Sequence, residues 1–391
     1  MAIANLLLAT LAGSAAATKL YITSYAPPNA TVGAVTTLEL SPGLGQGALK
    51  SVAANNECGS APTWLDDTLG NDVIFCVDEG FQTPNASINT LKINADGSLK
   101  SIAKVDTIQG PVSTQFFNKN KALALAHYGG SAISTFTVSG KGTFTPLQNF
   151  TFVAKGPRPE QEASHVHEAI IDPTGQYLLF PDLGADVVRV YCIDPATSLI
   201  AAHDSLQSKP GYGPRHAVFR KTGGKTYLYV IHELGNKIIA YKVEYLESGG
   251  LGFKEVQEIG LYGSQETPAG TKAAEISVSP DHRFIVASNR NATVFSVDNP
   301  DPKNSTKIPS DSLVTFAPKN DGTLEFVQLA PSGGSFPRHF KFNKDGSLIA
   351  VGNQNTFTVD VFTRNVKSGK LGARVASALI GAPVTNIVWD E

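Results

Sequence analysis

Short apolar runs recur along the whole chain, and each of them ends in a polar group. They begin at residues 20, 73, 122, 177, 227, 284 and 348, at intervals of 49 to 64 residues. Leu20–Tyr25, Tyr227–Leu234 and Leu348–Gln354 show the pattern. Their shortness and their β-branched and aromatic content predict strands rather than helices. Seven copies of one repeat therefore fill the chain.

The segments around each run are also alike. A second short strand is expected before it, as in His167–Ile171 and His339–Phe342, and a tight turn such as Asn343–Gly346 joins the two. Asp, Asn, Pro and Gly in these turns supply the dihedral angles of a hairpin. A third strand follows, as in Ile238–Val243, and the turn at Asp321–Gly322 fits a hairpin to a fourth. Each unit is thus predicted to be a four-stranded antiparallel sheet.

Seven such units, with no long helical pattern, predict an all-β fold, a seven-bladed β-propeller with four antiparallel strands in each blade. A single twisted sheet cannot bury both faces, whereas blades packed around a ring bury them and expose only short edges. Val384–Trp389 is expected to be the innermost strand of the blade that contains Leu20–Tyr25, so that the ends of the chain close the ring. A pair of β-sandwiches is the alternative, and it does not explain one sustained repeat length.

Composition agrees with this fold and argues against other classes. The 391 residues include 36 Gly and 23 Pro, only 17% are charged, and the net charge is −2. Disordered chains carry more charge, and coiled coils are poorer in Gly and Pro. Because the charge is nearly balanced and no basic stretch stands out, we do not expect nucleic acid as a partner.

The first 17 residues are predicted to be a secretory signal peptide, which leaves residues 18–391 as a single propeller domain. This segment has an apolar centre and ends in Ala15-x-Ala17, although it lacks a basic start. A buried N-terminal helix or strand is the alternative. The apolar stretch is too short to span a bilayer. We therefore expect a secreted, extracellular, monomeric protein with no membrane span.

Two further features agree with export. Five Asn-x-Ser/Thr sequons, each able to carry a glycan in a secretory compartment, occur at Asn29, Asn85, Asn149, Asn291 and Asn304. The three cysteines leave two possibilities open. Either Cys58 and Cys76 form a disulfide and Cys192 stays free, or all three are buried thiols.

The topology gathers polar residues at one mouth of the central channel. In each blade, the start of the first strand and the end of the second lie at the same end of the propeller. These positions hold His165, His167, Arg215, His216, Glu233, Glu275, Asn289, Arg290, Arg338, His339 and Gln354. Arginine binds carboxylate or phosphate, and His and Glu transfer protons. We expect a concave site there for a small anionic organic substrate, although any single member could be only a hydrogen-bonded structural group.

These motifs resemble the lactonase family of seven-bladed propellers, in a secreted fungal-type form. The matching stretches include His165–Gly175, Gly211–His216, Glu233–Asn236, Ala287–Arg290 and Phe336–Phe340. The family contains bacterial-type 6-phosphogluconolactonases and fungal carboxy-cis,cis-muconate cyclases. The resemblance implies either hydrolysis of a lactone or lactonization of a carboxymuconate, without a cofactor.

The cyclase branch uses a His, two Arg and a Glu at this mouth, which by motif look like His167, Arg215, Arg290 and Glu233. The arginines, with Arg338 as a third, are expected to hold the substrate carboxylate or a developing oxyanion, and Glu233 or His167 to transfer the proton. The other residues expected to bind substrate are His165, His216, Glu275, Arg338, His339, Asn289 and Gln354. The Gly-Pro-Arg-His and Phe-Pro-Arg-His motifs look more like the phosphogluconolactonase branch.

Two other interpretations stay open. A secreted glycoprotein propeller can act without catalysis, as a surface antigen or adhesin that binds extracellular proteins. A metal-dependent lactonase can use His165 and His167, with Asp182 and Glu162 nearby, to hold zinc or calcium. Nothing else in the sequence requires a metal. The absence of Gly-x-Ser-x-Gly argues against a serine hydrolase.

Overall fold

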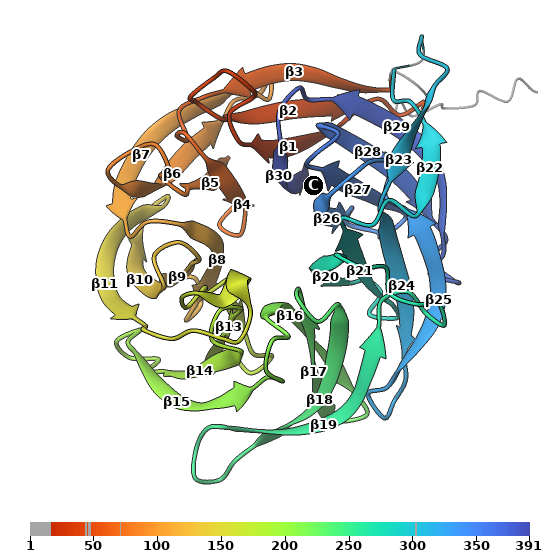
Figure 1. Ribbon diagram of the computed structural model, residues 1–391. Coiled ribbons are helices and arrows are strands. Elements are labelled where there is room, and N and C mark those ends of the chain that lie inside the picture. Colours follow the sequence, from red (N-terminus) through yellow and green to blue (C-terminus); the bar gives the residue numbers. More distant parts are fainter. Residues whose placement is uncertain (1–16, 44, 46–47, 71, 302) are drawn as a thin grey trace, which may run out of the picture.

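Seven four-stranded antiparallel sheets surround a central channel in the computed structural model (Figure 1). The structure describes residues 17–43, 45, 48–70, 72–301 and 303–391. The predicted seven-bladed β-propeller is confirmed. The expected leader lies outside the described residues, apart from Ala17.

The blades follow one another around the ring in chain order, and within each blade the strands run from the channel outward. Blade 1 contains β30 (Val384–Asp390), β1 (Thr18–Ser24), β2 (Ala34–Leu40) and β3 (Leu49–Asn55). Blade 2 contains β4 (Pro62–Asp66), β5 (Val73–Asp78), β6 (Ala86–Ile93) and β7 (Leu99–Thr107). Blade 3 contains β8 (Pro111–Phe117), β9 (Ala122–His127), β10 (Ala132–Ser139) and β11 (Thr143–Thr151).

The second half of the ring repeats the pattern. Blade 4 contains β12 (Ile170–Ile171), β13 (Tyr177–Asp182), β14 (Val187–Ile193) and β15 (Ile200–Gln207), and a 3₁₀ turn η1 (Pro159–Gln161) precedes it. Blade 5 contains β16 (Pro214–Thr222), β17 (Lys225–His232), β18 (Lys237–Tyr245) and β19 (Leu251–Gly260). Blade 6 contains β20 (Lys272–Val278), β21 (Ile285–Arg290), β24 (Ser312–Pro318) and β25 (Leu324–Pro331). Blade 7 contains β26 (Pro337–Phe342), β27 (Leu348–Asn353), β28 (Thr358–Arg364) and β29 (Leu371–Leu379).

The two ends of the chain close the ring, as predicted. The C-terminal strand β30 pairs antiparallel with β1, with Leu20 opposite Trp389. Leu20 and Trp389 also join a buried cluster with Val359 and Val361 of blade 7. The Trp389 indole N–H donates to the Lys341 carbonyl across the blade boundary at 3.0 Å. Closure therefore rests on a strand ladder and on apolar packing together.

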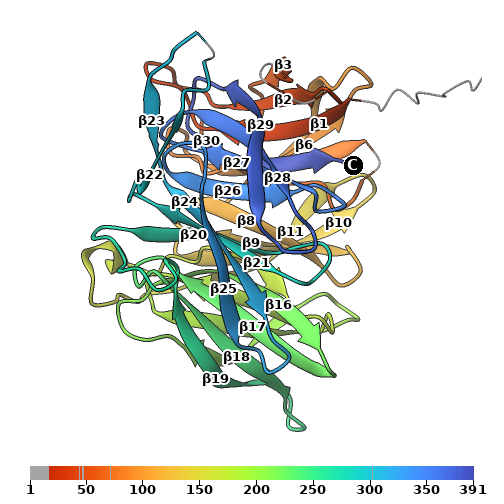
Figure 2. The same cartoon turned by 90° about the vertical axis from the view of Figure 1, so that its right-hand side faces the viewer.

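Blade 6 carries an inserted hairpin that explains the longest repeat interval. Strands β22 (Phe295–Asp298) and β23 (Lys307–Ser310) lie between β21 and β24 and form a separate two-stranded sheet. Figure 2 shows this hairpin on one side of the ring and the C-terminus on the other. The hairpin lies on the side where the innermost strands begin, because β21 ends there.

The innermost strand of blade 4 is shorter than the expected His167–Ile171. Only β12, of two residues, pairs regularly with β13, and an isolated bridge joins Val166 to Asp182. The His167 N–H still donates to the Pro181 carbonyl at 2.8 Å. Pro181 has no N–H to donate in return, so the ladder is interrupted at this point.

Features related to export are also resolved. Cys58 and Cys76 form a disulfide with a Cα–Cα distance of 5.9 Å, and Cys192 is a free thiol. All five sequon asparagines are exposed. In the part of the chain that the structure describes, no helix has the length and apolar character needed to cross a membrane.

Candidate active site

A cavity of about 230 Å³ opens at the end of the channel where the innermost strands begin. Every one of the seven blades, or the connection that follows one of its strands, contributes to its wall. The lining residues are Tyr25, Glu79, Phe81, Val112, Tyr128, His167, Arg215, Glu233, Arg290 and Arg338. The four residues that motif similarity assigned to catalysis are therefore brought together, with Arg338 beside them.

Arg215 reaches this cavity because the innermost strand of blade 5 bulges. Its pairing with β17 passes from Pro214 to His216 and leaves Arg215 out of the ladder. A proline is tolerated as the first residue of a strand because no ladder donor is needed there. A bulge re-aims the side chain that it leaves unpaired. Blade 7 has the same bulge at Arg338. In both blades the sequence Pro-Arg-His therefore places an arginine side chain at the mouth.

Glu233 holds two of the three arginines. Its Oε2 atom lies 3.1 Å from Arg215 Nε and 2.7 Å from Arg290 Nη2. Burial opposes ionisation, but Arg290 and Arg215 outweigh it and keep the pKa of Glu233 below its usual value. The ring of Phe336 lies 4.8 Å from the Arg290 guanidinium and supports it by a cation–π contact. Glu233 is therefore a fixed anion that orients two cations, and it is a weak base.

Three buried side chains determine which nitrogen of His167 carries the proton. His216 Nδ1 lies 3.1 Å from Glu275 Oε1, an acceptor, so this nitrogen is the donor and His216 Nε2 holds the lone pair. Arg215 Nη1, which can only donate, lies 3.3 Å from the same Nε2 and selects the same tautomer. His167 Nδ1 lies 3.1 Å from that lone pair and must therefore carry a hydrogen. The lone pair of His167 is left on Nε2.

The surroundings keep His167 neutral. Burial and then the charge of Arg215 lower its pKa well below the usual value for histidine. Glu275, in contrast, stays ionised. Burial disfavours its charge, but His216 and His339 outweigh burial and lower the pKa of Glu275 to about 2. The result is a neutral imidazole base that is hydrogen-bonded through His216 to a carboxylate. This is the arrangement of a catalytic triad with a second imidazole between the base and the carboxylate.

Glu79 and Tyr25 form a second polar pair in the cavity wall. The Tyr25 hydroxyl donates a hydrogen bond to Glu79 Oε1. Arg338 Nη2 lies 3.9 Å from the same oxygen. Burial raises the pKa of Glu79, and the opposing effects of Arg338 and Tyr25 do not cancel it. Two buried carboxyl groups of one cavity, Glu79 and Glu233, thus have pKa values shifted in opposite directions.

Sequence reasoning missed Tyr25, Glu79 and Tyr128 as site residues. They follow the second strands of blades 1, 2 and 3, in the position that Glu233 holds in blade 5. The apolar runs at 20, 73 and 122 end at these residues, so the signal was in the sequence.

Comparison with known proteins agrees with this geometry. Residues 19–388 match the family model described as "Lactonase, 7-bladed beta-propeller". The chain belongs to this family. A probable 6-phosphogluconolactonase of Arthroderma benhamiae is 28% identical over 345 residues, which cover 87% of this chain and 83% of that relative. A 6-phosphogluconolactonase of Formosa agariphila is 29% identical over 306 residues, which cover 76% and 80%.

A solved structure of a lactonase extends the comparison. The periplasmic gluconolactonase PpgL of Pseudomonas aeruginosa is 25% identical and superposes with a TM-score of 0.78, over 96% of this chain and 99% of that one. The name of that protein places it outside the cytoplasm.

Three of the residues expected to bind substrate lie beneath the cavity of this lactonase-family propeller. His216, Glu275 and His339 form a buried layer around Trp64, and none of them lines the cavity. The Trp64 ring meets those of His216 and His339 edge-on, at centroid distances of 6.1 Å and 5.3 Å. They line a smaller space that shares His167, Arg215 and Arg338 with the cavity above, and their contacts support those groups.

Three more expected substrate-binding residues also lie away from the cavity. His165 stacks on Tyr128 at a centroid distance of 4.2 Å. Asn289 is fully buried and donates to the Ser312 hydroxyl at 3.1 Å, because it precedes Arg290 on β21 and side chains alternate across a strand. Gln354 is bonded through its backbone to the Phe336 carbonyl, and its side chain does not line the cavity.

The groups considered for a metal do not converge. Asp182 accepts hydrogen bonds from Arg189 and from the backbone of His165. His167 turns to His216, while His165 Nε2 contacts Glu162 at 3.2 Å. Among the residues that the structure describes, no three His, Cys, Asp or Glu side chains are placed to bind one ion.

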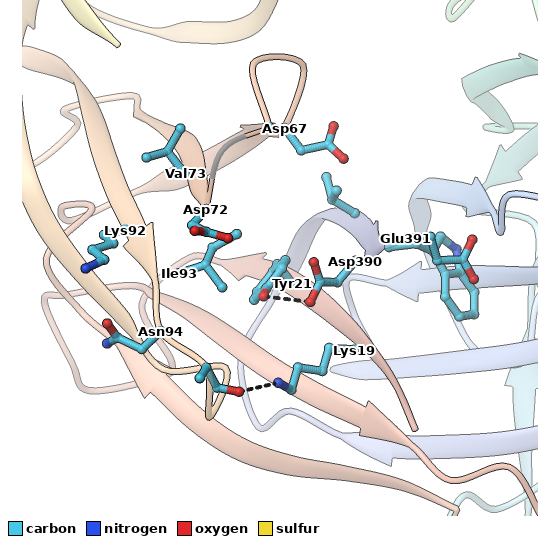
Figure 3. Close-up of a pocket in the computed structure, with 14 residues that line it drawn as sticks. Lys19, Tyr21, Asp67, Asp72, Val73, Lys92, Ile93, Asn94, Asp390 and Glu391 are labelled. Atoms are coloured by element: carbon cyan, nitrogen blue, oxygen red, sulfur yellow. Dashed lines mark hydrogen bonds between the residues drawn. The ribbon is translucent and has the colours of Figure 1, made fainter. Parts of the chain in front are cut away.

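A larger hollow, of about 650 Å³, lies at the opposite end of the ring, where β1 begins and β30 ends. Figure 3 shows its polar side chains. Tyr21 donates to Asp390 at 3.1 Å, and Lys19 donates to the Ala95 carbonyl at 3.1 Å. These contacts join the chain ends and a neighbouring turn. The hollow therefore belongs to ring closure, and the smaller cavity holds the acid–base groups.

Proposed function

We propose that this protein hydrolyses the lactone ring of a sugar acid in the mouth cavity, with His167 as the general base. One observation carries the proposal. The hydrogen-bonded series from Glu275 through His216 leaves a lone pair on His167 Nε2, in a cavity that also holds three arginines. The 6-phosphogluconolactonase names of the relatives support the same substrate class.

The chemistry follows from the placement of these groups. His167 Nε2 takes a proton from water as the water oxygen attacks the lactone carbonyl carbon. Negative charge develops on the carbonyl oxygen, and the guanidinium groups of Arg215 and Arg290 stabilise it because Glu233 holds them in place beforehand. Arg338, on another blade, lines the same cavity and is placed to bind an anionic substituent such as a carboxylate or phosphate.

Hydrolysis is favoured over lactonization by the state of the two acid–base candidates. A neutral histidine activates water, whereas ring closure of a muconate requires an acid that protonates carbon. Glu233, the carboxyl group that motif similarity assigns to proton transfer, cannot supply that proton, because two arginines hold it as an anion. The Pro-Arg motifs of blades 5 and 7 support the same choice.

We also propose that the protein is secreted, glycosylated and monomeric. The exposed sequons, the Cys58–Cys76 disulfide and the exported relative in Pseudomonas support export. The cavity wall comes from all seven blades of one chain, so the site requires no second copy.

The test is to offer purified glycosylated protein three substrates, namely glucono-δ-lactone, 6-phosphogluconolactone and 3-carboxymuconate. Titration of released acid measures ring opening, and ultraviolet absorbance measures consumption of the muconate. Ring opening of either sugar lactone above the spontaneous rate supports the proposal. Turnover of the muconate alone overturns it in favour of a cyclase, and no turnover of any substrate overturns it in favour of a binding protein.

A further inference from the structure

The proposed hydrolysis leaves one proton unassigned. When the ring carbon–oxygen bond breaks, the departing oxygen would leave as an alkoxide, which is a strong base. A general acid at this point commonly accelerates such a step by about 10²- to 10⁴-fold. His167 is committed to the attacking water, and Glu233 is held as an anion. Glu79 is the remaining carboxyl group in the wall of the cavity.

We propose that Glu79 is the general acid that protonates the departing ring oxygen, and that Tyr25 positions its carboxyl group. This inference rests on the proposed lactone hydrolysis. Both residues line the cavity that contains His167, and both come from blades far from it in the chain. Neither has a role in binding or activating the water.

The hydrogen bonding of Glu79 determines which of its oxygens carries the proton. The Tyr25 hydroxyl donates to Oε1, and Arg338 approaches the same atom. An oxygen that already faces two donors is a poor place for a proton. The proton therefore resides on Oε2. The ring of Tyr25 is itself held by the Arg338 guanidinium, 5.5 Å from its centroid, and meets Phe81 edge-on.

The charges around Glu79 couple its protonation to binding. Arg338 from blade 7 favours its carboxylate, while Asp78 on its own strand and the desolvation of the site favour its acid form. Tyr25 donates from blade 1 and does not ionise near neutral pH, because burial raises its pKa further. A substrate anion that binds Arg338 offsets the positive charge that favours the Glu79 carboxylate. Binding would thus shift Glu79 toward the proton-donating form.

The complete step balances in protons and bonds. Water gives one proton to His167 Nε2 and forms the new carbon–oxygen bond. The tetrahedral intermediate then breaks the ring carbon–oxygen bond, and the alkoxide takes the proton of Glu79. The proton on His167 returns to Glu79 through solvent, so one water molecule is consumed and the enzyme is regenerated. The opposite pKa shifts of His167 and Glu79 agree with a base and an acid in one site.

The test changes the leaving group by a single atom. The substrates are glucono-δ-lactone and its analogue with sulfur in the ring, whose thiolate departs without a proton. In the Glu79→Gln variant, hydrolysis of the oxygen lactone should fall about 10²- to 10³-fold, while that of the thiolactone should change less than about fivefold. Tyr25→Phe should show the same selectivity with a smaller loss. Glu162→Gln is the matched control, a carboxylate near the same mouth that does not line the cavity.

The pH dependence gives an independent measurement on the oxygen lactone alone. Because the acid form of Glu79 is the active one, the wild-type rate should fall as pH rises through its raised pKa. Glu79→Gln should lose this decline. The inference is overturned if Glu79→Gln keeps the wild-type rate on the oxygen lactone, or if it keeps the alkaline decline. If the wild-type protein opens no lactone at all, the proposed function itself fails.

Discussion

The two ends of this propeller differ in what their polar groups do. The hollow at the far end is larger, about 650 Å³ against 230 Å³, but its polar contacts join the chain ends and nearby turns. Tyr21 and Lys19 are bonded to neighbouring segments there. At the mouth, side chains from all around the ring face a common space, and the charged ones come from blades 2, 5, 6 and 7. The comparison teaches that convergence of buried ionisable groups, rather than volume, identifies the site.

The difference has a structural cause. Turns connect the strands at the far end, and their Asp and Asn side chains bond to the turn backbone, as Asp96 does to Ser98. At the mouth, bulges expel residues from the ladder and leave their side chains to the channel. Substitutions at the mouth should therefore change rate, and substitutions at the far end should change stability.

The largest effect is expected from Glu275→Gln. The amide can turn its NH2 group toward His216 Nδ1, so the carboxylate no longer fixes the tautomer that presents a lone pair to His167, and only Arg215 still favours it. The turnover number should fall about 10³-fold with little change in KM, as a positioning role requires, and steady-state kinetics measures both. Glu168→Gln is the control, since that buried carboxyl also lies near His216, at 3.9 Å, but burial raises its pKa well above the usual value. An equal loss in both variants would contradict the tautomer argument.

A smaller loss of rate is expected from Arg290→Lys. Lysine keeps the charge, but it cannot reproduce the planar fork that contacts Glu233 and the reacting oxygen. The value of kcat/KM should fall about 10²-fold, the usual loss for one donor to an oxyanion. Thermal unfolding of the same variant provides the check. A loss of stability with full activity would show that Arg290 is only a structural partner of Glu233.

The smallest effect, and the one specific to the far end, is expected from Tyr21→Phe. It removes the hydroxyl that donates to Asp390 across the ring closure. Denaturant unfolding should show a loss of about 1 kcal/mol, the usual contribution of one hydrogen bond. Lactone hydrolysis should be unaffected. A drop in turnover would mean that the two ends are coupled, and would remove the distinction drawn between them.

The fold could be predicted because the same pattern of apolar runs and turns occurs in every blade. Seven similar runs and their turns indicate blade number, strand order and the closing strand Val384–Trp389, and errors in one blade do not disturb the others. Irregularities escaped this reasoning. The β22–β23 hairpin is an insertion into one blade, and the short β12 depends on a single proline, Pro181, in the neighbouring strand.

The position of a residue at a strand end predicts that it lies near the mouth of the channel, and the sequence predicts the site only to that extent. Arg215, Glu233, Arg290 and His167 were found because topology alone places them at the mouth. Asn289, one residue before Arg290, faces Ser312 instead of the cavity, because the direction of a side chain depends on register and a shift of one residue reverses it. The bulges that turn Arg215 and Arg338 inward are shifts of this kind. Which polar residues line the cavity and which lie beneath it was therefore not accessible from spacing.

The central claim is that the lone pair on His167 Nε2 activates water for lactone hydrolysis. Its most direct test compares the turnover of glucono-δ-lactone by the wild-type protein, by His167→Gln and by His203→Gln, which alters a histidine of the outer strand β15. We predict that His167→Gln loses about 10²- to 10⁴-fold in turnover at an unchanged melting temperature, while His203→Gln retains the wild-type rate. Undiminished turnover by His167→Gln would contradict the account.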